Sequence, residues 1–551
     1  MKKLIILGLV GWAVWTAVSC GDQLDVTPPN AITNEQVAAL LATADSAQRE
    51  NILKGITGDL PMLISRVQVE GGNDWRNQFY VSLLNVRAIM GNDAVMATQA
   101  RLDRTSPPYG KEQYTFVNQR TSTSSFNRNF WLAGWNMIHS ANKALAILSD
   151  EVVGSAASLK RPQAWAHFVR AYGYSWLLDN YQDAYAVGGG SKPGMPVYLT
   201  FDPSQPYQAR ATLDECYAQI NKDLDKAIAN YTFGGTDGFT EAKNDLDAGS
   251  AYFLRARVAL HTGDYAKAIE DLQKLVNHFG ESFMTEEQYV AKQETVDDKI
   301  QYFAVNSGFM NLEQNPEVIY GLPFAEATRT GETSAASPGQ ALNCFATGTT
   351  NGSTFGNNIL IDVRLYDKIA DGDYRKNNFL IESITYEFAD KNTQELLPYA
   401  NLKFASTVGV TGGTNPGLAN GTSIQNDWVI MRLSEVYLML AEAYAKSGNE
   451  SAAKNTLDKL IAARTGGTYA TDTYPATAGK STLEKIQLQW RIEMWGENGI
   501  EYYNNKRWNI PVDRSGSANH WFKEIVIPVS DLTMQLPEES VNYNGLLTQN
   551  P

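Results

Sequence analysis

Two segments of the chain repeat one pattern of small and large apolar residues, and this pattern constrains the fold more than any other feature. The first segment, YFLRARVALHTGDYAKAIEDLQKLV, covers residues 252–276, and the second, YLMLAEAYAKSGNESAAKNTLDKLI, covers residues 437–461. After a shift of 185 positions the two match at six places: Tyr252 with Tyr437, Ala256 with Ala441, Gly263 with Gly448, Ala268 with Ala453, Leu272 with Leu457 and Leu275 with Leu460. Small alanines let two helices approach closely, and a glycine ends the first helix. Each segment is therefore predicted to fold as a packed helix pair.

The spacing within these segments resembles the tetratricopeptide repeat, whose period is about 34 residues. A single helix pair of this kind cannot bury its apolar face alone, so further helices must stack beside it. Apolar residues at helical spacing mark four candidates: 126–148, 162–181, 211–231 and 482–498. Pro162 is expected in the first turn of its helix, where a proline is tolerated. The predicted fold is mainly α-helical, a tetratricopeptide-like repeat scaffold.

Two long stretches, 323–360 and 405–427, lack helical periodicity and are rich in glycine, threonine, serine and asparagine. A helical scaffold with long polar loops usually places its recognition residues on those loops. Such stretches can equally be solvated connections, and their composition does not decide between the two roles. The scaffold is therefore expected to carry long irregular loops and few short strands.

The N-terminus has the pattern of an export signal. Lys2 and Lys3 precede an apolar run over residues 4–18, which has the length of a signal-peptide core and is short for a membrane span. The run ends in AVSC, with Cys20 last, and this resembles the lipobox of bacterial lipoproteins. In such proteins the cysteine becomes the new N-terminus and carries acyl chains, each buried methylene contributing about 0.8 kcal/mol to membrane binding. An ordinary signal peptide that happens to contain Cys20 is the alternative.

These features predict the domain organisation. Residues 1–19 form a lipoprotein signal peptide, and the polar, proline-bearing residues 20–35 form a tether. Residues 36–551 form a single α-helical domain, with an N-terminal part over about 36–300 and a C-terminal part over about 301–551.

Charge and missing motifs exclude several classes of function. Removal of the signal with its two lysines lowers the formal net charge from −14 to −16, and such an acidic chain repels nucleic acid. The sequence has no HExxH, CxxC, GxSxG, P-loop or GxGxxG motif, so neither a transition-metal site nor a nucleotide cofactor is expected. The stretch IADGDYRKN (369–377) lacks the ligand spacing of an EF-hand, so structural calcium is open but unsupported. Cys216 and Cys344 are expected to be unpaired thiols, although one disulfide between them is an alternative.

Several recognisable segments lie in a fixed order along nearly the whole mature chain. They are CGDQLDVTP, FVRAYGYSWLLDNYQDAY, ARVALHTGDYAKAI, NPEVIY, WVIMRLSEVYLMLAEAYAKSG, RIEMWGENGIEYYNNKRWN, EIVIPVSDL and the terminal LLTQNP. In this order they resemble the SusD/RagB-type proteins, the surface nutrient-binding lipoproteins of Bacteroidetes. Trp490 stands where the family usually has an acidic residue, and Asn504-Asn505 where it usually has Asp-Leu. Both departures are expected to affect only a packing helix.

The resemblance implies a binding protein and not an enzyme. Such a protein sits as a lid over a TonB-dependent outer-membrane transporter of the SusC type, captures oligosaccharides and passes them inward. It implies anchoring in outer-membrane lipid through acylated Cys20, and the acidic Asp22 and Asp25 fit display on the cell surface. A peptide-binding member of the same family is one alternative, and a protein-binding repeat scaffold without a small ligand is another.

Sugars present hydroxyls at their edges and C–H groups on their faces, so a sugar site needs a flat aromatic ring beside hydrogen-bonding side chains. The first candidate is Trp75, in a region that family members tend to use as one wall of the site; alternatively its ring packs in the core. The polar candidates around it are Asn73, Asp74, Arg76 and Asn77. The remaining candidates are Asn92 and Asp93, which could instead cap a helix, and, as an opposite wall, Phe309, Asn311, Phe345 and Phe355.

Three carboxylates raise the alternative of a glycoside hydrolase, which uses one acid and one nucleophile. Glu493, Glu497 and Glu501 lie four residues apart and are expected to share one helix face. Charges on such a face are usually solvated or paired, here with Arg432, Arg491 or Arg507. Catalysis by these residues is therefore not expected.

Overall fold

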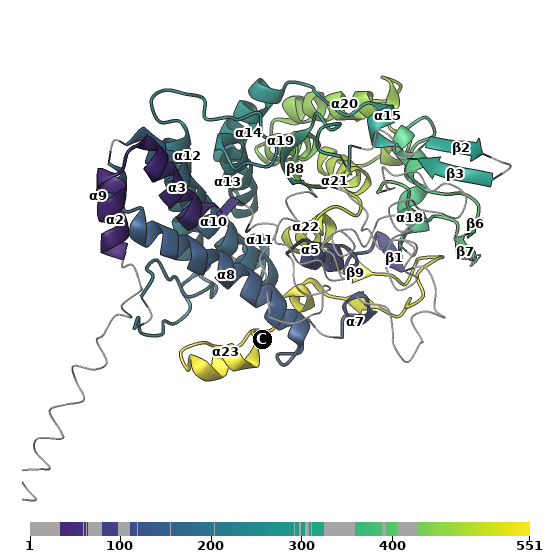
Figure 1. Cartoon of the computed structure of the whole chain (residues 1–551). Helices are drawn as coiled ribbons and strands as arrows, with labels where there is room; N and C mark the ends of the chain where they lie inside the picture. The colour runs from purple at the N-terminus through teal and green to yellow at the C-terminus, as the bar shows by residue number, and fades with distance from the viewer. Residues whose placement is uncertain are drawn as a thin grey trace, which may run out of the picture.

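A computed structural model describes most of the chain after its N-terminus. The described residues are 34–58, 60–61, 63, 80–96, 111–117, 119–154, 156–202, 204–290, 292–296, 299–303, 308–309, 311–323, 359–387, 393–404 and 427–551. Within them helices dominate and the strands are short, which confirms the predicted fold class (Figure 1). The signal peptide and Cys20 lie outside the described residues, and the last two residues of the predicted tether, Asn34 and Glu35, already belong to a helix.

A succession of packed helices forms the scaffold. In chain order they are α8 (Ser125–Ile147), α10 (Ala157–Tyr181), α12 (Leu213–Tyr231), α13 (Ala248–Thr262), α14 (Tyr265–Phe279), α19 (Leu433–Lys446) and α20 (Glu450–Thr465). Each packs on the next, so that α14 meets α19 across the long insertion that separates them in sequence. The two repeated segments are therefore adjacent in space, as stacked helix pairs.

The two pairs turn in the same way. Gly263 has a φ of 84° and Gly448 a φ of 82°, a left-handed conformation in which a glycine avoids the steric penalty of a Cβ. The next residue in each case begins the second helix with a side-chain cap, Asp264 accepting from the Lys267 N–H and Asn449 from the Ala452 N–H. The matching alanines of the first helices, Ala256 and Ala441, are completely buried. The prediction of helix pairs that nest through small residues is confirmed.

Two predicted helix boundaries are wrong. The helix predicted to begin at Pro162 begins at Ala157, so the proline lies inside it and not in its first turn. The proline is tolerated there because the carbonyl it leaves unpaired belongs to Ser158, an exposed residue that water can reach. The helix predicted over 482–498 ends at Glu493, because glycine and asparagine residues with positive φ follow it.

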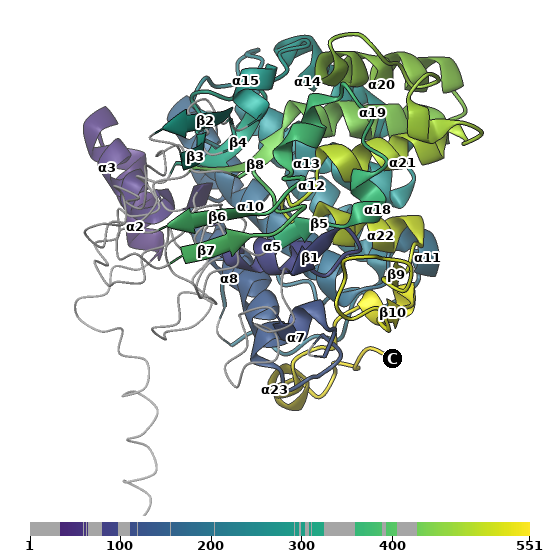
Figure 2. The same cartoon turned by 90° about the vertical axis from the view of Figure 1, so that its right-hand side faces the viewer.

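The strands pair in two-stranded antiparallel ribbons. The ribbons are β1 (Ala94–Met96) with β5 (Ile359–Ile361), β2 (Lys292–Val296) with β3 (Lys299–Phe303), β4 (Val318–Leu322) with β8 (Trp428–Arg432), β6 (Ile384–Glu387) with β7 (Thr393–Leu396), and β9 (Val512–Asp513) with β10 (Val526–Ile527). Figure 2 shows β6–β7 and β1–β5 on one side of the molecule, between α21 above and α7 below. The ribbons β1–β5 and β4–β8 are buried and join segments far apart in the sequence.

Shorter elements complete the described fold. They are α2 (Asn34–Thr43), α3 (Ser46–Thr57), α5 (Tyr80–Ala88), α7 (Lys111–Tyr114), α9 (Asp150–Val153), α11 (Tyr185–Gly188), α15 (Glu286–Tyr289), α18 (Val363–Tyr366), η2 (Tyr374–Asn378), η3 (Pro475–Thr477), α21 (Thr482–Glu493), α22 (Ile500–Trp508), η4 (Val529–Leu532) and α23 (Glu538–Tyr543). The main hydrophobic core takes residues from Leu60 to Leu547, so both predicted parts of the chain contribute to it. The division into a signal, a tether and one domain stays a prediction. Among the described residues, no helix has the length and apolar content needed to cross a membrane.

Candidate functional site

The three spaced glutamates do not share a helix face, contrary to the sequence prediction. Glu493 is the last residue of α21, Glu497 lies in the following turn, and Glu501 lies in the first turn of α22. The turn contains Gly496, with a φ of 73°, and Gly499, with a φ of 65°. These left-handed conformations interrupt the helix, so each carboxylate meets a different set of partners.

Glu493 lies at the centre of a buried ionic cluster. Its Oε1 accepts hydrogen bonds from Arg432 (2.8 Å) and Arg464 (2.9 Å), and its Oε2 accepts one from Arg375 (3.0 Å). The same Arg432 and Arg464 also donate to Glu317, at 2.8 and 2.5 Å. Burial opposes ionisation, but the surrounding arginines outweigh it and hold the pKa of Glu493 well below its ordinary value. A carboxylate held in this way stays ionised and cannot deliver a proton.

Glu497 extends the cluster toward a buried lysine. It accepts from Arg432 Nε and Nη2, both at 2.7 Å, and from Lys403 Nζ at 2.6 Å. Burial lowers the pKa of Lys403 to about 8, although Glu497 opposes that shift. Of the three arginines expected to pair with these glutamates, Arg432 does so. Arg491 pairs with Asp93 instead, and Arg507 with Glu442. The cluster joins β8, the C-terminal end of α21 and the irregular segment around residue 403.

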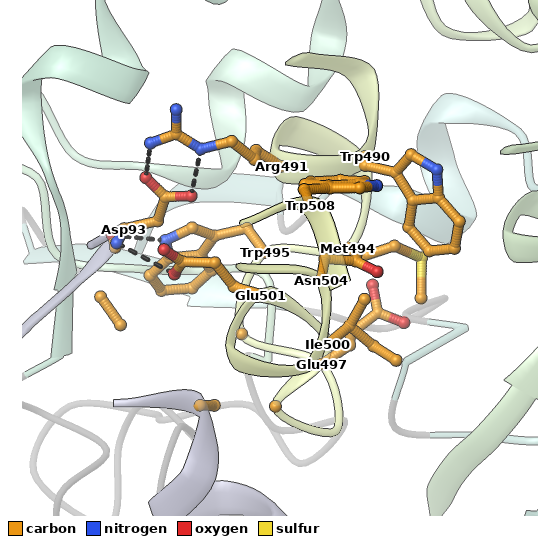
Figure 3. Close-up of a pocket in the computed structure, with 14 residues that line it drawn as sticks. Asp93, Trp490, Arg491, Met494, Trp495, Glu497, Ile500, Glu501, Asn504 and Trp508 are labelled. Carbon is orange, nitrogen blue, oxygen red and sulfur yellow. Dashed lines mark hydrogen bonds and ion pairs between the residues drawn. The ribbon is translucent and has the colours of Figure 1, made fainter. Parts of the chain in front are cut away.

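A small cavity lies beside this cluster, between α5, β1 and the α21–α22 turn (Figure 3). Asp93 forms a two-pronged ion pair with Arg491, whose Nε lies 2.8 Å from the carboxylate. The Trp495 indole donates to the Asp93 carbonyl at 2.8 Å, and Glu501 accepts the backbone N–H groups of Asn92 (2.5 Å) and Asp93 (3.0 Å). The cavity holds about 10 Å³, which is room for about one water molecule. A sugar ring cannot enter it.

We expect Glu501 to make stability depend on pH. Burial and the Asp93 charge raise the pKa of the Glu501 carboxyl from 4.5 to about 7, against Arg491 and two backbone N–H groups. The folded chain then holds this proton more tightly than the unfolded chain, so the contribution is present below about pH 4.5 and is lost as pH rises to about 7. Urea denaturation measures the free energy of unfolding at each pH. Over this interval that free energy should change less in Glu501→Gln than in the parent protein, by on the order of 1–3 kcal/mol. The exposed control Glu524→Gln should keep the parent's pH profile; equal slopes in all three proteins would contradict the role of Glu501.

A much larger pocket, of about 580 Å³, lies between α8 and residues 198–207. Its lining includes Trp135, His139, Asn142, Tyr198, Phe201 and Tyr207. None of the ligand-binding residues predicted from the sequence lines this pocket. The available signal was the spacing of Trp135, His139 and Asn142, which places them on one face of a helix, together with three aromatic residues in a proline-bearing loop. Two segments that meet only in the folded chain form the pocket.

Comparison with known families decides the assignment. A SusD family model matches residues 343–551, and a SusD-like model described as starch-binding associating with outer membrane matches residues 24–230. The chain belongs to the SusD family. A tetratricopeptide repeat model matches residues 250–282, which cover α14 and all but the first two residues of α13. The family assignment made from the ordered segments is confirmed.

Solved structures share the fold of this SusD-family chain over most of its length. A SusD-like carbohydrate-binding protein from Bacteroides vulgatus is 21% identical, with 90% of this chain and 97% of that protein covered and a TM-score of 0.68. A SusD superfamily protein from Bacteroides thetaiotaomicron is 18% identical, with 91% and 99% covered and a TM-score of 0.64. One from Parabacteroides distasonis is 16% identical, with 91% and 98% covered and a TM-score of 0.63. No curated protein sequence gives a significant match.

The departures from the family pattern lie on packed helices, as expected. Trp490 is on α21 and is 2% exposed, and Asn504 and Asn505 are on α22 and are each 2% exposed. Asn504 accepts from Arg507 Nε at 2.7 Å, and Asn505 donates to Glu501 at 3.3 Å. These side chains help position the buried charges of the SusD-family scaffold.

Four of the predicted ligand-binding residues are described, and three are buried among other side chains. Asn92 accepts from the Asp513 N–H (2.7 Å) and donates to the Pro511 carbonyl (3.3 Å). Asp93 pairs with Arg491. Neither residue caps a helix, so the alternative role considered for them is wrong. Phe309 is 3% exposed and meets Phe404 edge-on.

Asn311 is half-buried and accepts from the Glu313 N–H at 3.0 Å, which stabilises a tight turn. The other predicted residues lie outside the described part of the chain: Asn73, Asp74, Trp75, Arg76, Asn77, Phe345 and Phe355, together with Cys344. That all these residues contact a ligand stays a prediction.

Cys216 is a buried free thiol, and burial raises its pKa to about 11. Among the described residues, no group of His, Cys, Asp and Glu side chains has an arrangement suited to a metal ion.

Proposed function

We propose that this protein is a cell-surface lipoprotein that binds oligosaccharides and passes them to a TonB-dependent outer-membrane transporter of the SusC type. The observation that carries the proposal is the match of residues 24–230 to the starch-binding, outer-membrane-associated SusD-like model. That range includes the aromatic and polar stretch around Trp75. The carbohydrate-binding protein from Bacteroides vulgatus, which has the same fold, supports a sugar as the ligand.

Binding without catalysis is consistent with the state of the glutamates. A glycosidase needs one carboxyl group that keeps its proton and a second that is free to attack or to activate water. Glu493 is completely buried and Glu497 is 5% exposed, and both are occupied by arginine or lysine donors. Glu501 holds a proton more tightly, but it accepts the backbone N–H groups of Asn92 and Asp93 beside a cavity of about 10 Å³, which has no room for a sugar. This placement of the three groups supports a role in holding the scaffold together.

The proposed ligand site is the stretch Asn73–Asn77, with Trp75 as the surface on which a sugar ring stacks. This stretch precedes α5, whose Leu83, Leu84 and Val86 are at most 2% exposed. Helix α5 packs on α7, α8 and α22, so the described segment that follows the proposed site is firmly anchored. An anchored neighbour lowers the conformational cost of presenting a binding residue.

Attachment to the membrane is proposed through acyl chains on Cys20. The residues that follow, GDQLDVTPPN, are polar and contain two prolines, which suits an extended link between lipid and the helical domain. Because the mature chain has a formal charge of −16, binding to anionic lipid headgroups without acylation is not expected.

We expect Trp75→Ala to weaken oligosaccharide binding about tenfold, because a sugar face loses its aromatic platform. Isothermal titration of the mature protein would use maltohexaose, cellohexaose, mannohexaose and xylohexaose, with a panel of short peptides beside them. The control is Phe233→Ala, which removes an aromatic ring 42% exposed elsewhere on the surface. Heat from the peptides alone would favour the peptide-binding alternative, and silence in both panels would overturn capture of small ligands.

The tetratricopeptide match favours one second candidate, a scaffold that binds only another protein. On that reading Trp75→Ala changes nothing in either titration. Co-purification of an outer-membrane transporter with the parent protein, in the absence of any saccharide binding, would support it.

A further inference from the structure

We propose that the pocket between α8 and residues 198–207 is a second saccharide site, one that takes a neutral sugar unit. It goes beyond the proposed function because it lies among other residues than the stretch around Trp75 and needs none of them. Its volume of about 580 Å³ falls in the range of about 300–1,000 Å³ that small-molecule sites occupy. It is therefore large enough for a sugar ring, unlike the cavity beside Asp93.

The two walls of this pocket are fastened to each other by hydrogen bonds. The Tyr174 hydroxyl donates to the Tyr198 carbonyl at 2.9 Å and accepts from the Tyr198 N–H at 2.7 Å. Asn142, on α8, donates to the same carbonyl at 3.0 Å. The start of the loop wall therefore has a fixed position against α8 and α10, as a preformed site requires.

A buried ion pair between Arg170 and Asp223 stabilises the contact between α8 and the loop. Arg170 donates to the Leu199 carbonyl at 3.2 Å and to the Asn142 side chain at 3.0 Å. The same guanidinium contacts both carboxylate oxygens of Asp223, at 2.9 and 2.6 Å, and His167 contacts that carboxylate at 2.7 Å. Arg170 is thus held by Asp223 in the orientation that fixes the loop, so the pocket is built into the scaffold.

Aromatic rings supply the apolar surfaces of the pocket. The ring of Trp135 meets those of Tyr198 and Tyr174 edge-on, with centroids 5.8 and 6.1 Å away, so its orientation is set. Phe201 meets the His139 ring at 5.1 Å, and Tyr207 is 60% exposed. Tyr207 is thus a partly exposed ring on the loop, and Trp135 adds an indole to the same pocket. Aromatic rings placed in this way can stack on the C–H faces of a sugar.

Polar groups lie beside these rings. Thr200 donates to Gln205 at 2.9 Å, and the Asp202 carboxylate accepts from the Ser204 N–H at 2.8 Å, which orders the loop and leaves oxygen lone pairs for hydroxyl donors. The Trp135 indole N–H has no acceptor among the described residues. The indole nitrogen is itself fully buried, so Trp135 contributes apolar surface to the pocket and not a hydrogen bond.

The charges of the lining select the class of sugar. Among the described residues that line the pocket there is no lysine or arginine, and Asp202 is its only carboxylate. An acidic sugar or a phosphate would meet the like charge of Asp202, with no lysine or arginine in the described lining to offset it. A purely apolar ligand would offer no donor to the remaining lone pairs of the Asp202 carboxylate. A neutral saccharide can stack its C–H faces on the rings and donate hydroxyl hydrogen bonds to the polar groups.

The test is isothermal titration of the mature protein and its variants with the four neutral hexasaccharides above and with trigalacturonic acid as the acidic probe. Tyr207→Ala should weaken one binding event about tenfold, and Phe201→Ala should weaken the same event. Because Tyr207 is mostly exposed, its loss should leave the thermal melting temperature unchanged. Phe233→Ala is again the matched control.

The Trp75→Ala background separates this site from the proposed one. Binding that persists in Trp75→Ala and disappears in Trp75→Ala/Tyr207→Ala would establish the pocket as a site of its own. Parent-like binding of every oligosaccharide by Tyr207→Ala and by Phe201→Ala would overturn it while leaving the proposed function intact. Tighter binding of trigalacturonic acid than of the neutral sugars, or competition by an apolar peptide, would overturn the assigned ligand class.

Discussion

Replacing Arg464 by methionine is expected to lower the free energy of unfolding by about 3–5 kcal/mol, the range for breaking a buried ion pair on one side. Arg464 is completely buried and donates to Glu317 (2.5 Å), Glu493 (2.9 Å), the Tyr374 hydroxyl (3.0 Å) and the Ser434 hydroxyl (2.8 Å). Methionine fills much of the same volume but offers no donor. Two buried carboxylates would then share the remaining arginines and lose part of their stabilisation.

Urea denaturation at pH 7, followed by tryptophan fluorescence, measures this loss. The matched control is Arg128→Met, which removes an ion pair with Glu539 at 3.5 Å whose side chains are 38% and 63% exposed. An exposed pair contributes less than about 1 kcal/mol, so this variant should stay close to the parent. Equal effects of the two substitutions would show that the buried cluster does not stabilise the scaffold.

Gly173→Ala is expected to destabilise the protein by about 1–3 kcal/mol, the typical range for overpacking. Helices α8 and α10 cross at this point, and a Cβ at Gly173 would lie 2.9 Å from the backbone oxygen of Gly134. It would also lie 3.0 Å from an Ile138 side-chain carbon. A backbone oxygen cannot rotate away as a side chain can, so the two helices would have to separate.

Gly55→Ala is the matched control for this prediction, and the sign of its effect should be opposite. Gly55 lies inside α3, and nothing lies within 4 Å of the Cβ it would gain. Alanine there should raise the free energy of unfolding by about 0.5–1 kcal/mol, because it reduces the freedom of the unfolded chain. Destabilisation by both substitutions, or by neither, would contradict the close-crossing explanation.

The repeated helix pairs could be predicted because the relevant information is local. Tyr252, Ala256 and Gly263 recur with the same spacing as Tyr437, Ala441 and Gly448, and helical periodicity needs only neighbouring residues to be read. Helix boundaries were harder, as Pro162 shows. A proline is most familiar in a first turn, yet one inside a helix is tolerated when water reaches the carbonyl that it leaves unpaired, as at Ser158.

The roles of the charged and polar residues were not predictable in the same way. Glu493, Glu497 and Glu501 have the spacing of a solvated helix face, but the turn with Gly496 and Gly499 separates them. The sequence does contain that signal, as GENG. The sequence predicts ligand contacts or a helix cap for Asn92 and Asp93, because their partners Asp513 and Arg491 lie about 400 residues away along the chain.

By itself the sequence determined the class of fold, the two nested helix pairs and the membership of the SusD family, since these depend on patterns carried along one stretch of chain at a time. Only the tertiary structure decided which glutamates pair with buried cations and where a sugar-sized pocket forms. The physical reason is that the energy of a charge, and the space beside a ring, depend on groups that folding brings together from distant segments. The ionic cluster around Glu493 and the pocket beside Trp135 are both of this kind.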